Sequence, residues 1–371
     1  MKYYILAGEA SGDLHGSNLI KAIKTKDANA EVRCWGGDLM QEAGAQLVSH
    51  YKERAFMGFF EVIKNLFSIL KLIKFCKEDI ISFQPDALIF IDNSGFNLRI
   101  AKWAKPLGFK TFYYISPQVW ASRAGRVKTI KEVIDHMYVV FPFVKDFYTT
   151  YDYPVQYVGH PLIDAIQTYK LSDKEVFKKE FHLEEKPIIA LLPGSRKQEI
   201  TNMLNTMLCL VSDYPQYQFI IAAAPSQETT FYKTLMGNTN VKLIKSRTYD
   251  ILNNADAALV TSGTATLETA LFKVPQVVCY KGSLISYAIA KRIVKLKYIS
   301  LVNLVMDTEV VTELIQEEFN YKNLKLEFGK IIEGETRKSM LLAYDDLEEK
   351  LGGVGASNTT AQSIFEILNS S

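Results

Sequence analysis

A glycine-containing turn in the second half of the sequence combines three residues that suit a phosphate group. Gly194, Ser195 and Arg196 follow the continuous apolar run 188–192. The glycine permits close approach of the backbone, the serine can donate a hydrogen bond, and the arginine offers a bidentate cation. These residue types predict a diphosphate-binding turn. The alternative interpretation is an exposed arginine in a surface turn.

A second turn of this kind follows the apolar run 257–260. Ser262, Gly263 and Thr264 would open a helix with backbone N–H groups and hydroxyls that together suit an anion. Glu268, one turn further on, is placed to accept hydrogen bonds from a pair of ribose hydroxyls. An ordinary helix cap would explain this turn alone. Two such turns, both after strands, favour a nucleoside diphosphate site.

The first half of the chain offers a carboxylate for acid–base chemistry. Asp92 directly follows the apolar run 87–91, so a parallel strand would deliver it to the carboxyl edge of a sheet. A carboxylate in that position can act as a general base toward an acceptor hydroxyl. A helix cap is the competing interpretation, and His15, His136 and His160 are rival bases.

The turn at residues 8–13, GEASGD, follows the first apolar run. It departs from the G-x-G-x-x-G pattern of dinucleotide-binding folds, which disfavours an NAD-dependent oxidoreductase. Carboxylates at Glu9 and Asp13 would repel phosphate and suit sugar hydroxyls better. This turn is therefore the expected acceptor side, and the alternative is a tight turn in which Asp13 caps the helix.

Short apolar runs alternate with segments of helical period along most of the chain. Most runs are continuous, which is typical of strands buried on both faces of a parallel sheet. The pattern predicts a doubly wound α/β fold with strands at residues 3–7, 32–35, 87–91, 111–115, 137–141, 188–192, 219–223, 241–244, 257–260 and 276–280.

The alternation pauses between residues 159 and 186, where the sequence is helical and charged without a strand candidate. We therefore expect two Rossmann-like domains, residues 1–165 and 186–350, facing an interdomain cleft that holds the ligands. The helical segment 356–369 is a candidate to pack back on the first domain.

Composition excludes several classes of protein. The 371 residues are 48% hydrophobic, and 43 basic against 41 acidic residues leave a net charge of +2, which disfavours a nucleic-acid binder. The four scattered cysteines indicate reduced, buried thiols.

We expect a cytoplasmic protein, because the sequence has neither a signal peptide nor a membrane-spanning stretch. The absence of a D-x-D motif and of metal-ligand spacing favours a reaction without metal.

Residues 56–77 combine a wide apolar helical face with a narrow polar stripe, and every charge from residue 62 to 77 is positive. Such a helix fits the surface of an anionic bilayer. A second basic and apolar stretch covers residues 286–301. Core helices with solvated lysines are the alternative, but two such patches favour a peripheral membrane protein that handles a lipid. The membrane-facing residues would be Phe59, Phe60, Ile63, Leu66, Phe67 and Leu70.

These pieces together resemble the lipid-A-disaccharide synthases, a glycosyltransferase family with the GT-B fold of two Rossmann-like domains. The resemblance runs in order from residue 8 to about residue 307 and is carried by GEASGD (8–13), GG-x-x-M (36–40), MG-x-x-EV (57–62), PD (85–86), ID-x-x-x-FN (91–97), SPQVWA (116–121), FPF with FY (141–148), GH (159–160), LLPGSR (191–196), SGTATLE (262–268) and SL-x-NL (300–304).

The resemblance implies an inverting transfer of 2,3-diacylglucosamine from its UDP donor, UDP-diacylglucosamine. The acceptor would be 2,3-diacylglucosamine 1-phosphate (lipid X), giving a β-1,6-linked disaccharide 1-phosphate and UDP without cofactor or metal. By position, Asp92 would be the general base and Arg196 would stabilise the departing UDP. UDP would lie against Gly194, Ser195, Ser262, Gly263, Thr264 and Glu268, with Asn303 nearby. The acceptor would lie against Glu9, Ser11, Gly12, Asp13 and Trp120.

The resemblance further implies attachment to the inner membrane surface of a Gram-negative bacterium, and it favours a homodimer. Two departures stand out: Ser94-Gly95 replaces the family's Pro-Asp, and Ser122 replaces a tryptophan. The rival functions are another GT-B enzyme on UDP-N-acetylglucosamine, either a lipid-linked transferase or a 2-epimerase, and a non-catalytic lipid-binding relative. The apolar helix argues against the epimerase, and the retention of Asp92 and Arg196 argues against the non-catalytic relative.

Overall fold

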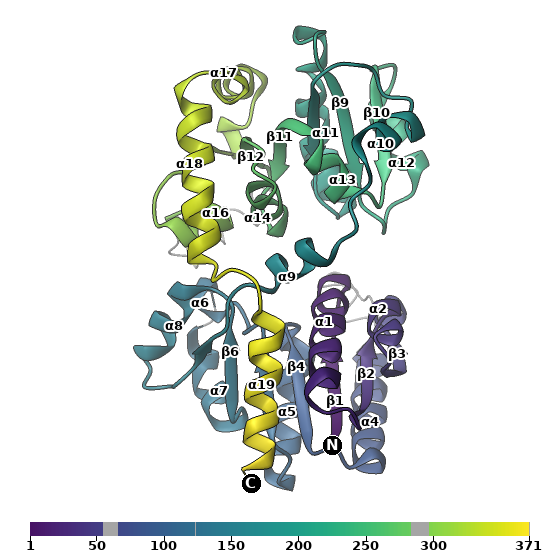
Figure 1. Ribbon diagram of the computed structural model, residues 1–371, viewed down its shortest axis with the longest axis vertical. Helices are drawn as coiled ribbons and strands as arrows, with labels where there is room; N and C mark the ends of the chain where they lie inside the picture. The colour runs from purple at the N-terminus through teal and green to yellow at the C-terminus, as the bar shows by residue number, and fades with distance from the viewer. Residues whose placement is uncertain (55–65, 123, 283–296, 371) are drawn as a thin grey trace. The chain divides into compact units, whose positions relative to one another are not determined.

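The computed structural model describes residues 1–54, 66–122, 124–282 and 297–370. The chain forms two compact units, each with its own parallel sheet (Figure 1). Unit 1 comprises Met1–Thr168 and Leu351–Ser371, and unit 2 comprises Tyr169–Lys350. The C-terminal segment therefore returns to the unit in which the chain began.

The sheet of unit 1 has seven strands in the order β3-β2-β1-β4-β5-β6-β7, all parallel. Its central strands are buried on both faces, which explains their continuous apolar sequence. The strands are β1 (Lys2–Ala7), β2 (Glu31–Gly36), β3 (Gln46–His50), β4 (Ala87–Ile91), β5 (Thr111–Tyr114), β6 (His136–Val139) and β7 (Gln156–Tyr157).

Helices connect these strands and cover the sheet. They are α1 (Ala10–Lys26), α2 (Asp38–Glu42), α4 (Leu66–Phe83), α5 (Ser94–Ala104), α6 (Val119–Ser122), α7 (Val127–Val133), α8 (Pro142–Thr149), α9 (Pro161–Thr168) and the C-terminal α19 (Ala356–Asn369). Helix α19 packs on α1 and α9, and the buried Asp164 carboxylate accepts hydrogen bonds from the N–H groups of Gly355 (2.6 Å) and Ser357 (2.9 Å) at its N-terminus.

Unit 2 repeats the plan with six parallel strands in the order β10-β9-β8-β11-β12-β13. These are β8 (Ile188–Leu192), β9 (Gln218–Ala223), β10 (Val241–Lys245), β11 (Ala255–Thr261), β12 (Gln276–Tyr280) and β13 (Glu313–Ile315). The described helices are α10 (Lys174–Glu180), α11 (Lys197–Leu208), α12 (Thr229–Met236), α13 (Thr248–Asn253), α14 (Thr264–Leu271), α16 (Leu301–Met306), α17 (Tyr321–Ile332) and α18 (Glu335–Lys350).

The predicted α/β fold with parallel sheets is confirmed. All ten predicted strands are present, with ends within about two residues of the predicted ones. The sequence missed β3, β7 and β13, each of which lies at the edge of its sheet. Edge strands are buried less and can be short, so their apolar signal is weak.

Each sheet has a point at which the strand order reverses, next to its first strand. In unit 1 this point lies between β1 and β4, and in unit 2 it lies between β8 and β11. Turns that follow two such strands leave a crevice at their carboxyl ends, where doubly wound folds bind ligands. All four predicted chemistry-bearing turns follow these four strands.

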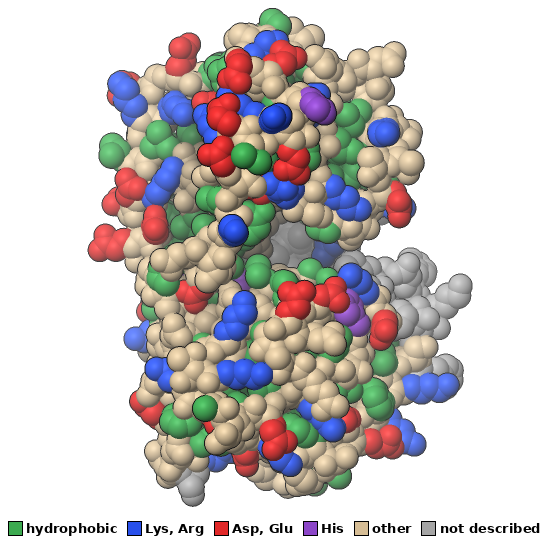
Figure 2. All heavy atoms as spheres, turned by 45° about the vertical axis from the view of Figure 1, so that its right-hand side comes forward, with side chains coloured by type: hydrophobic (Ala, Val, Ile, Leu, Met, Phe, Trp, Pro, Cys, Tyr) green, Lys and Arg blue, Asp and Glu red, His purple; other side chains and the backbone are tan. Residues whose placement is uncertain are grey.

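Charged side chains of both signs are interspersed on the face of each unit that Figure 2 shows. This mixing matches the near balance of 43 basic and 41 acidic residues.

Candidate functional site

The two phosphate-type turns of unit 2 line one cavity of about 280 Å³. Of the residues predicted for UDP, the cavity brings together Gly194, Ser195, Ser262, Gly263, Thr264 and Glu268. Glu199, Thr248 and Thr261, which the sequence analysis did not single out, also line it. The cavity lies at the reversal point between β8 and β11.

The first of these turns requires glycine. Gly194 has φ +104°, and a Cβ built there would lie 2.9 Å from Oε2 of Glu199. The next residues begin α11, where the Glu199 carboxylate accepts a hydrogen bond from the backbone N–H of Arg196 at 3.3 Å. Glu199 Oε1 also lies 3.3 Å from Nη1 of Arg196, whose side chain is 67% exposed. Arg196 is thus next to the cavity with its charge partly neutralised.

The second turn leaves one hydroxyl unused. Thr261, the last residue of β11, is buried, and its Oγ1 has no hydrogen-bond partner among the described residues. Ser262, by contrast, donates from its hydroxyl to the carbonyl of Ile299 at 2.8 Å. An unpartnered buried hydroxyl in a cavity wall is available to a ligand. Its sequence signal was a hydroxyl residue at the end of an apolar strand.

Glu268, on α14, also lines the cavity. It accepts a hydrogen bond at 3.2 Å from the phenol of Tyr249, a residue the sequence analysis missed. Withdrawal from bulk water raises the pKa of Glu268, and the Tyr249 hydrogen bond opposes that shift. Tyr249 fixes one carboxylate oxygen, so the other is free to accept from a ligand hydroxyl.

Asn303 supports the site from behind and does not belong to the cavity wall. Its amide nitrogen donates to the carbonyl of Val311 (2.8 Å) and to Glu313 (2.9 Å), and its oxygen accepts from the N–H groups of Val310 and Val311. Glu313 in turn accepts from the N–H groups of Ile299 and Ser300. Asn303 is fully buried and holds the segment that receives the Ser262 hydroxyl.

In unit 1 the structure places Asp92 and Glu9 at the ends of the neighbouring strands β4 and β1. The Asp92 side chain reaches solvent, and its backbone has φ +44°. Partial desolvation and the Glu9 charge raise the pKa of Asp92, and a hydrogen bond from the backbone of Asn93 opposes this shift. A carboxylate with a raised pKa is a stronger base.

The remaining residues of the GEASGD turn differ in their roles. Asp13 is buried, and its carboxylate accepts hydrogen bonds from the N–H groups of Gly37 (2.7 Å), Met40 (3.0 Å) and Leu39 (3.2 Å). It therefore caps α2, and all three bonds are to residues distant in sequence. Gly12 and Ser11 lie in the first turn of α1, Gly12 buried and Ser11 exposed.

Three histidines were rivals of Asp92. Burial lowers the pKa of His15 to about 4 and of His160 to about 3, so both rings are neutral in the interior of unit 1. His160 Nδ1 already accepts a hydrogen bond from the N–H of Leu162. His136 stacks on Phe112 with ring centroids 5.2 Å apart. None of the three follows β1 or β4 directly, whereas Asp92 does.

Trp120, the tryptophan of the SPQVWA motif, is half-buried in α6. Its ring packs edge-on against Phe143 with centroids 4.9 Å apart. Part of the indole remains accessible for an apolar ligand group.

Of the residues predicted to face a membrane, Phe59, Phe60 and Ile63 lie outside the described part of the chain. Leu66 and Phe67 begin α4, and Leu70, one turn further, is 53% exposed. The second basic stretch, 286–301, lies mostly outside the described residues. Among the helices that are described, none is long and apolar enough to cross a membrane, and no three metal-ligand side chains cluster there.

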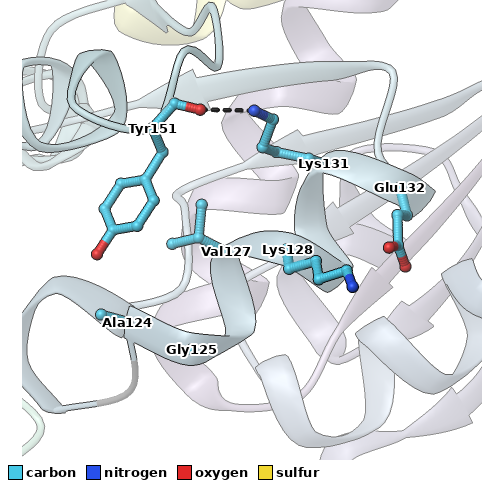
Figure 3. A pocket seen from close by; sticks show the side chains of 7 residues that line it. All are labelled: Ala124, Gly125, Val127, Lys128, Lys131, Glu132 and Tyr151. Carbon is cyan, nitrogen blue, oxygen red and sulfur yellow. Dashed lines mark hydrogen bonds between the residues drawn. The ribbon is translucent and has the colours of Figure 1, made fainter.

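Unit 1 also contains a cavity of about 430 Å³ beside α7 (Figure 3). Tyr151 lies opposite Val127, and the Lys131 ammonium donates to the carbonyl of Tyr151 at 2.5 Å. None of the residues predicted from the sequence for chemistry lines this cavity.

Comparison with solved structures shows the fold. The chain superposes on UDP-GlcNAc 2-epimerase from Neisseria meningitidis bound to UDP-GlcNAc with a TM-score of 0.67 at 14% identity, covering 100% of both chains. It superposes on the S. aureus MnaA–UDP co-structure with a TM-score of 0.72 at 12% identity, covering 99% of this chain and 97% of that chain. These likenesses confirm the GT-B fold.

Comparison of sequences shows the family. The chain is 38% identical to lipid-A-disaccharide synthase of Syntrophus aciditrophicus over 99% of this chain and 98% of that protein. It is 35% identical to the enzyme of the same name from Coxiella burnetii, over 98% of each. The family model described as lipid-A-disaccharide synthetase matches residues 3–365. The chain therefore belongs to the lipid-A-disaccharide synthase family of glycosyltransferases.

Proposed function

We propose that the chain transfers 2,3-diacylglucosamine from UDP-2,3-diacylglucosamine to 2,3-diacylglucosamine 1-phosphate, lipid X. The observation that carries this proposal is the cavity of unit 2, which joins two anion-type turns and the half-buried carboxylate Glu268 at one reversal point. The reaction forms a β-1,6-linked disaccharide 1-phosphate and releases UDP. Family membership supports the choice of sugar and acceptor.

Unit 2 would hold the donor. The N–H groups and hydroxyls of the turns at 194–196 and 262–264 would bind the diphosphate, and Glu268 would accept hydrogen bonds from the ribose hydroxyls. Arg196 would turn from Glu199 toward the phosphates. As the bond between the sugar C1 and the phosphate oxygen breaks, negative charge grows on UDP, which the guanidinium stabilises.

Asp92 of unit 1 would act as the general base. Its carboxylate accepts the proton of the acceptor 6-hydroxyl while that oxygen forms the new bond to C1, and UDP leaves with the electrons of the old bond. Attack opposite the leaving group inverts the anomeric centre. Asp92 is suited to this role because its side chain is accessible and its pKa is raised by its surroundings and by Glu9.

The acceptor would be positioned by groups around the GEASGD turn. Glu9 and Ser11 are exposed there and can bond sugar hydroxyls, while Gly12 and Asp13 shape the turn and its neighbour α2. Trp120 offers an apolar surface for an acyl chain. Asn303 would serve the donor side indirectly through the segment it holds.

The enzyme would work at the cytoplasmic surface of the inner membrane, since both substrates carry acyl chains. Residues 56–77 would lie on the bilayer. The exposed Leu70, Lys71 and Lys74 of α4 support this assignment, because apolar and cationic groups together favour an anionic lipid surface. A homodimer is part of the same proposal and rests on the family resemblance.

The test is an assay of the purified protein with UDP-2,3-diacylglucosamine and lipid X, in the presence of EDTA. Mass spectrometry follows the disaccharide 1-phosphate and UDP. We expect both products, and Asp92→Asn should lower the rate about 100-fold or more while UDP binding persists. If the folded wild-type protein binds UDP but forms no disaccharide, lipid X is not its acceptor substrate. If Asp92→Asn keeps the wild-type rate, Asp92 is not the general base.

A further inference from the structure

Two buried side chains hold the backbone that carries Asp92. The carbonyl of Asp92 accepts a hydrogen bond from the phenol of Tyr113, at the middle of the neighbouring strand β5. The same carbonyl accepts a second bond at 2.9 Å from the amide of Asn97 on α5. Tyr113 and Asn97 come from different elements, so the carbonyl is held from two sides.

The turn held in this way has an unfavourable backbone. Asp92 and Asn93 have φ of +44° and +40°, so two successive non-glycine residues adopt the left-handed conformation. Aspartate and asparagine tolerate it better than other side chains, but it is still disfavoured. On the other side Gly8 leaves room for Asn93, because a Cβ there would lie 2.2 Å from the Asn93 amide nitrogen. Such a turn persists only where its surroundings specify it.

The hydrogen bonds that the Asn97 side-chain amide donates in the described structure go to the ends of β4 and β1. Asn97 is 1% exposed, and its amide nitrogen also donates to the carbonyls of Ile91 (3.1 Å) and Leu6 (3.4 Å), at the ends of β4 and β1. Its amide oxygen is buried without a hydrogen-bond partner in the described structure. The whole donor capacity of Asn97 is therefore directed at the strand ends that carry the GEASGD turn and Asp92.

Tyr113 remains a donor throughout the working pH range. Burial and the charge of Asp92 raise its pKa well above the usual range of a tyrosine, so the phenol stays protonated. A protonated phenol can satisfy the Asp92 carbonyl, which a phenylalanine could not.

We propose that Tyr113 and Asn97 are positioning residues that fix the direction of the Asp92 carboxylate by clamping its backbone carbonyl. This inference deepens the proposed function and rests on Asp92 as the base. A base works only within hydrogen-bond reach of its proton, and a shift of about 1 Å can lower the rate 100-fold. Loosening the clamp should therefore lower kcat and leave UDP binding unchanged.

Tyr113→Phe is the main test, because it removes one hydroxyl and keeps the ring. Its matched control is Tyr153→Phe, since the buried Tyr153 phenol also donates to a backbone carbonyl of unit 1, that of Ile134 at 2.9 Å. We expect Tyr113→Phe to lower kcat about 10-fold with the Kd of UDP within about twofold of wild type, and Tyr153→Phe to leave kcat within about twofold. Equal kcat values for the two variants would overturn the proposal.

A double-mutant cycle separates positioning from general loosening of unit 1. In the Asp92→Asn background, Tyr113→Phe should change the residual rate by less than about twofold, because the group it positions no longer acts as a base. An equal loss in both backgrounds would overturn the clamp. A wild-type rate of the Asp92→Asn variant alone is a different outcome, because it would show that Asp92 is not the general base.

Asn97→Ala removes the other hydrogen bond to the Asp92 carbonyl and provides a second test. It replaces Tyr113→Phe if thermal unfolding shows that the Tyr113→Phe variant does not fold. Asn254→Ala is its control, because the Asn254 amide also donates to a backbone carbonyl, that of Asp250 at 2.8 Å, and its oxygen is likewise unpartnered. A folded Asn97→Ala with the kcat of Asn254→Ala would overturn the proposal.

Discussion

The guanidinium of Arg196 lies 3.3 Å from the carboxylate of Glu199, which lines the cavity in unit 2. Glu199 thus places a negative charge where the proposed UDP diphosphate binds, and it also accepts the N–H of Arg196 at the start of α11. The pair has two consequences for binding. The ion pair offsets part of the charge that Arg196 can offer to a phosphate, and Glu199 itself repels an anionic ligand.

Glu199→Gln should strengthen UDP binding. Glutamine keeps the oxygen that caps α11 and removes the charge, so we expect the Kd of UDP to fall about two- to fivefold at low salt. Isothermal titration calorimetry measures the change. The control is Glu335→Gln, which breaks a similar i, i+3 pair with Lys338 on the exposed surface of α18 and should leave Kd unchanged. Weaker binding by Glu199→Gln would show that the carboxylate helps the ligand.

Thr261→Val should weaken UDP binding by about five- to tenfold, because it removes the unpartnered hydroxyl from the cavity wall and keeps the shape. Thr269→Val is the matched control. The Thr269 hydroxyl is buried on α14 but already bonded to the carbonyl of Ala265 at 2.8 Å. Calorimetry with UDP compares the two, and equal affinities would mean that the Thr261 hydroxyl makes no bond to the nucleotide.

Glu9→Gln should move the acid limb of the pH–kcat profile to lower pH. The Glu9 charge contributes to the raised pKa of Asp92, and Asp92 must be ionised to accept a proton. Removing the negative charge lowers that pKa, so activity persists further into acid. Initial rates across a pH series at saturating substrates provide the measurement. If the acid limb of the pH–kcat profile does not move, the Glu9 charge does not affect the pKa of Asp92.

Asp13→Ala should destabilise the protein by about 3 kcal/mol, because three backbone N–H groups lose a buried acceptor. Urea unfolding measures the change. Asp173→Ala offers the contrast, since Asp173 caps α10 at the surface through the N–H groups of Glu175 and Val176 and should cost only about 1 kcal/mol. Equal effects would mean that burial adds nothing to the Asp13 cap.

Leu70→Ser should reduce sedimentation with vesicles that contain anionic lipid, because it removes an exposed apolar side chain from α4. Leu326→Ser on α17 is the control, as Leu326 is 60% exposed on a helix of unit 2. Unchanged binding of Leu70→Ser would assign membrane contact to other residues. Equal losses in both variants would point to nonspecific adsorption.

The parallel α/β architecture and the positions of the candidate turns could be predicted from the residue pattern along the chain. Continuous apolar runs mark buried parallel strands, and glycine, serine and threonine after a run mark the turns, so both signals are local. Asp92 and the turns at 194–196 and 262–264 could therefore be placed at strand ends without a structure. The edge strands β3 and β7 were not predicted, because few of their residues are buried.

The contacts of the polar side chains, in contrast, depend on how the chain folds in three dimensions. Asp13 was expected to face a ligand or cap its own helix, yet it caps α2 through residues about 24 positions away. Tyr113 meets the carbonyl of Asp92 only because β4 and β5 are neighbours, and the Thr261 hydroxyl is unpartnered only because of what surrounds it. A hydrogen bond depends on direction and distance in space, which neither residue type nor spacing along the chain records.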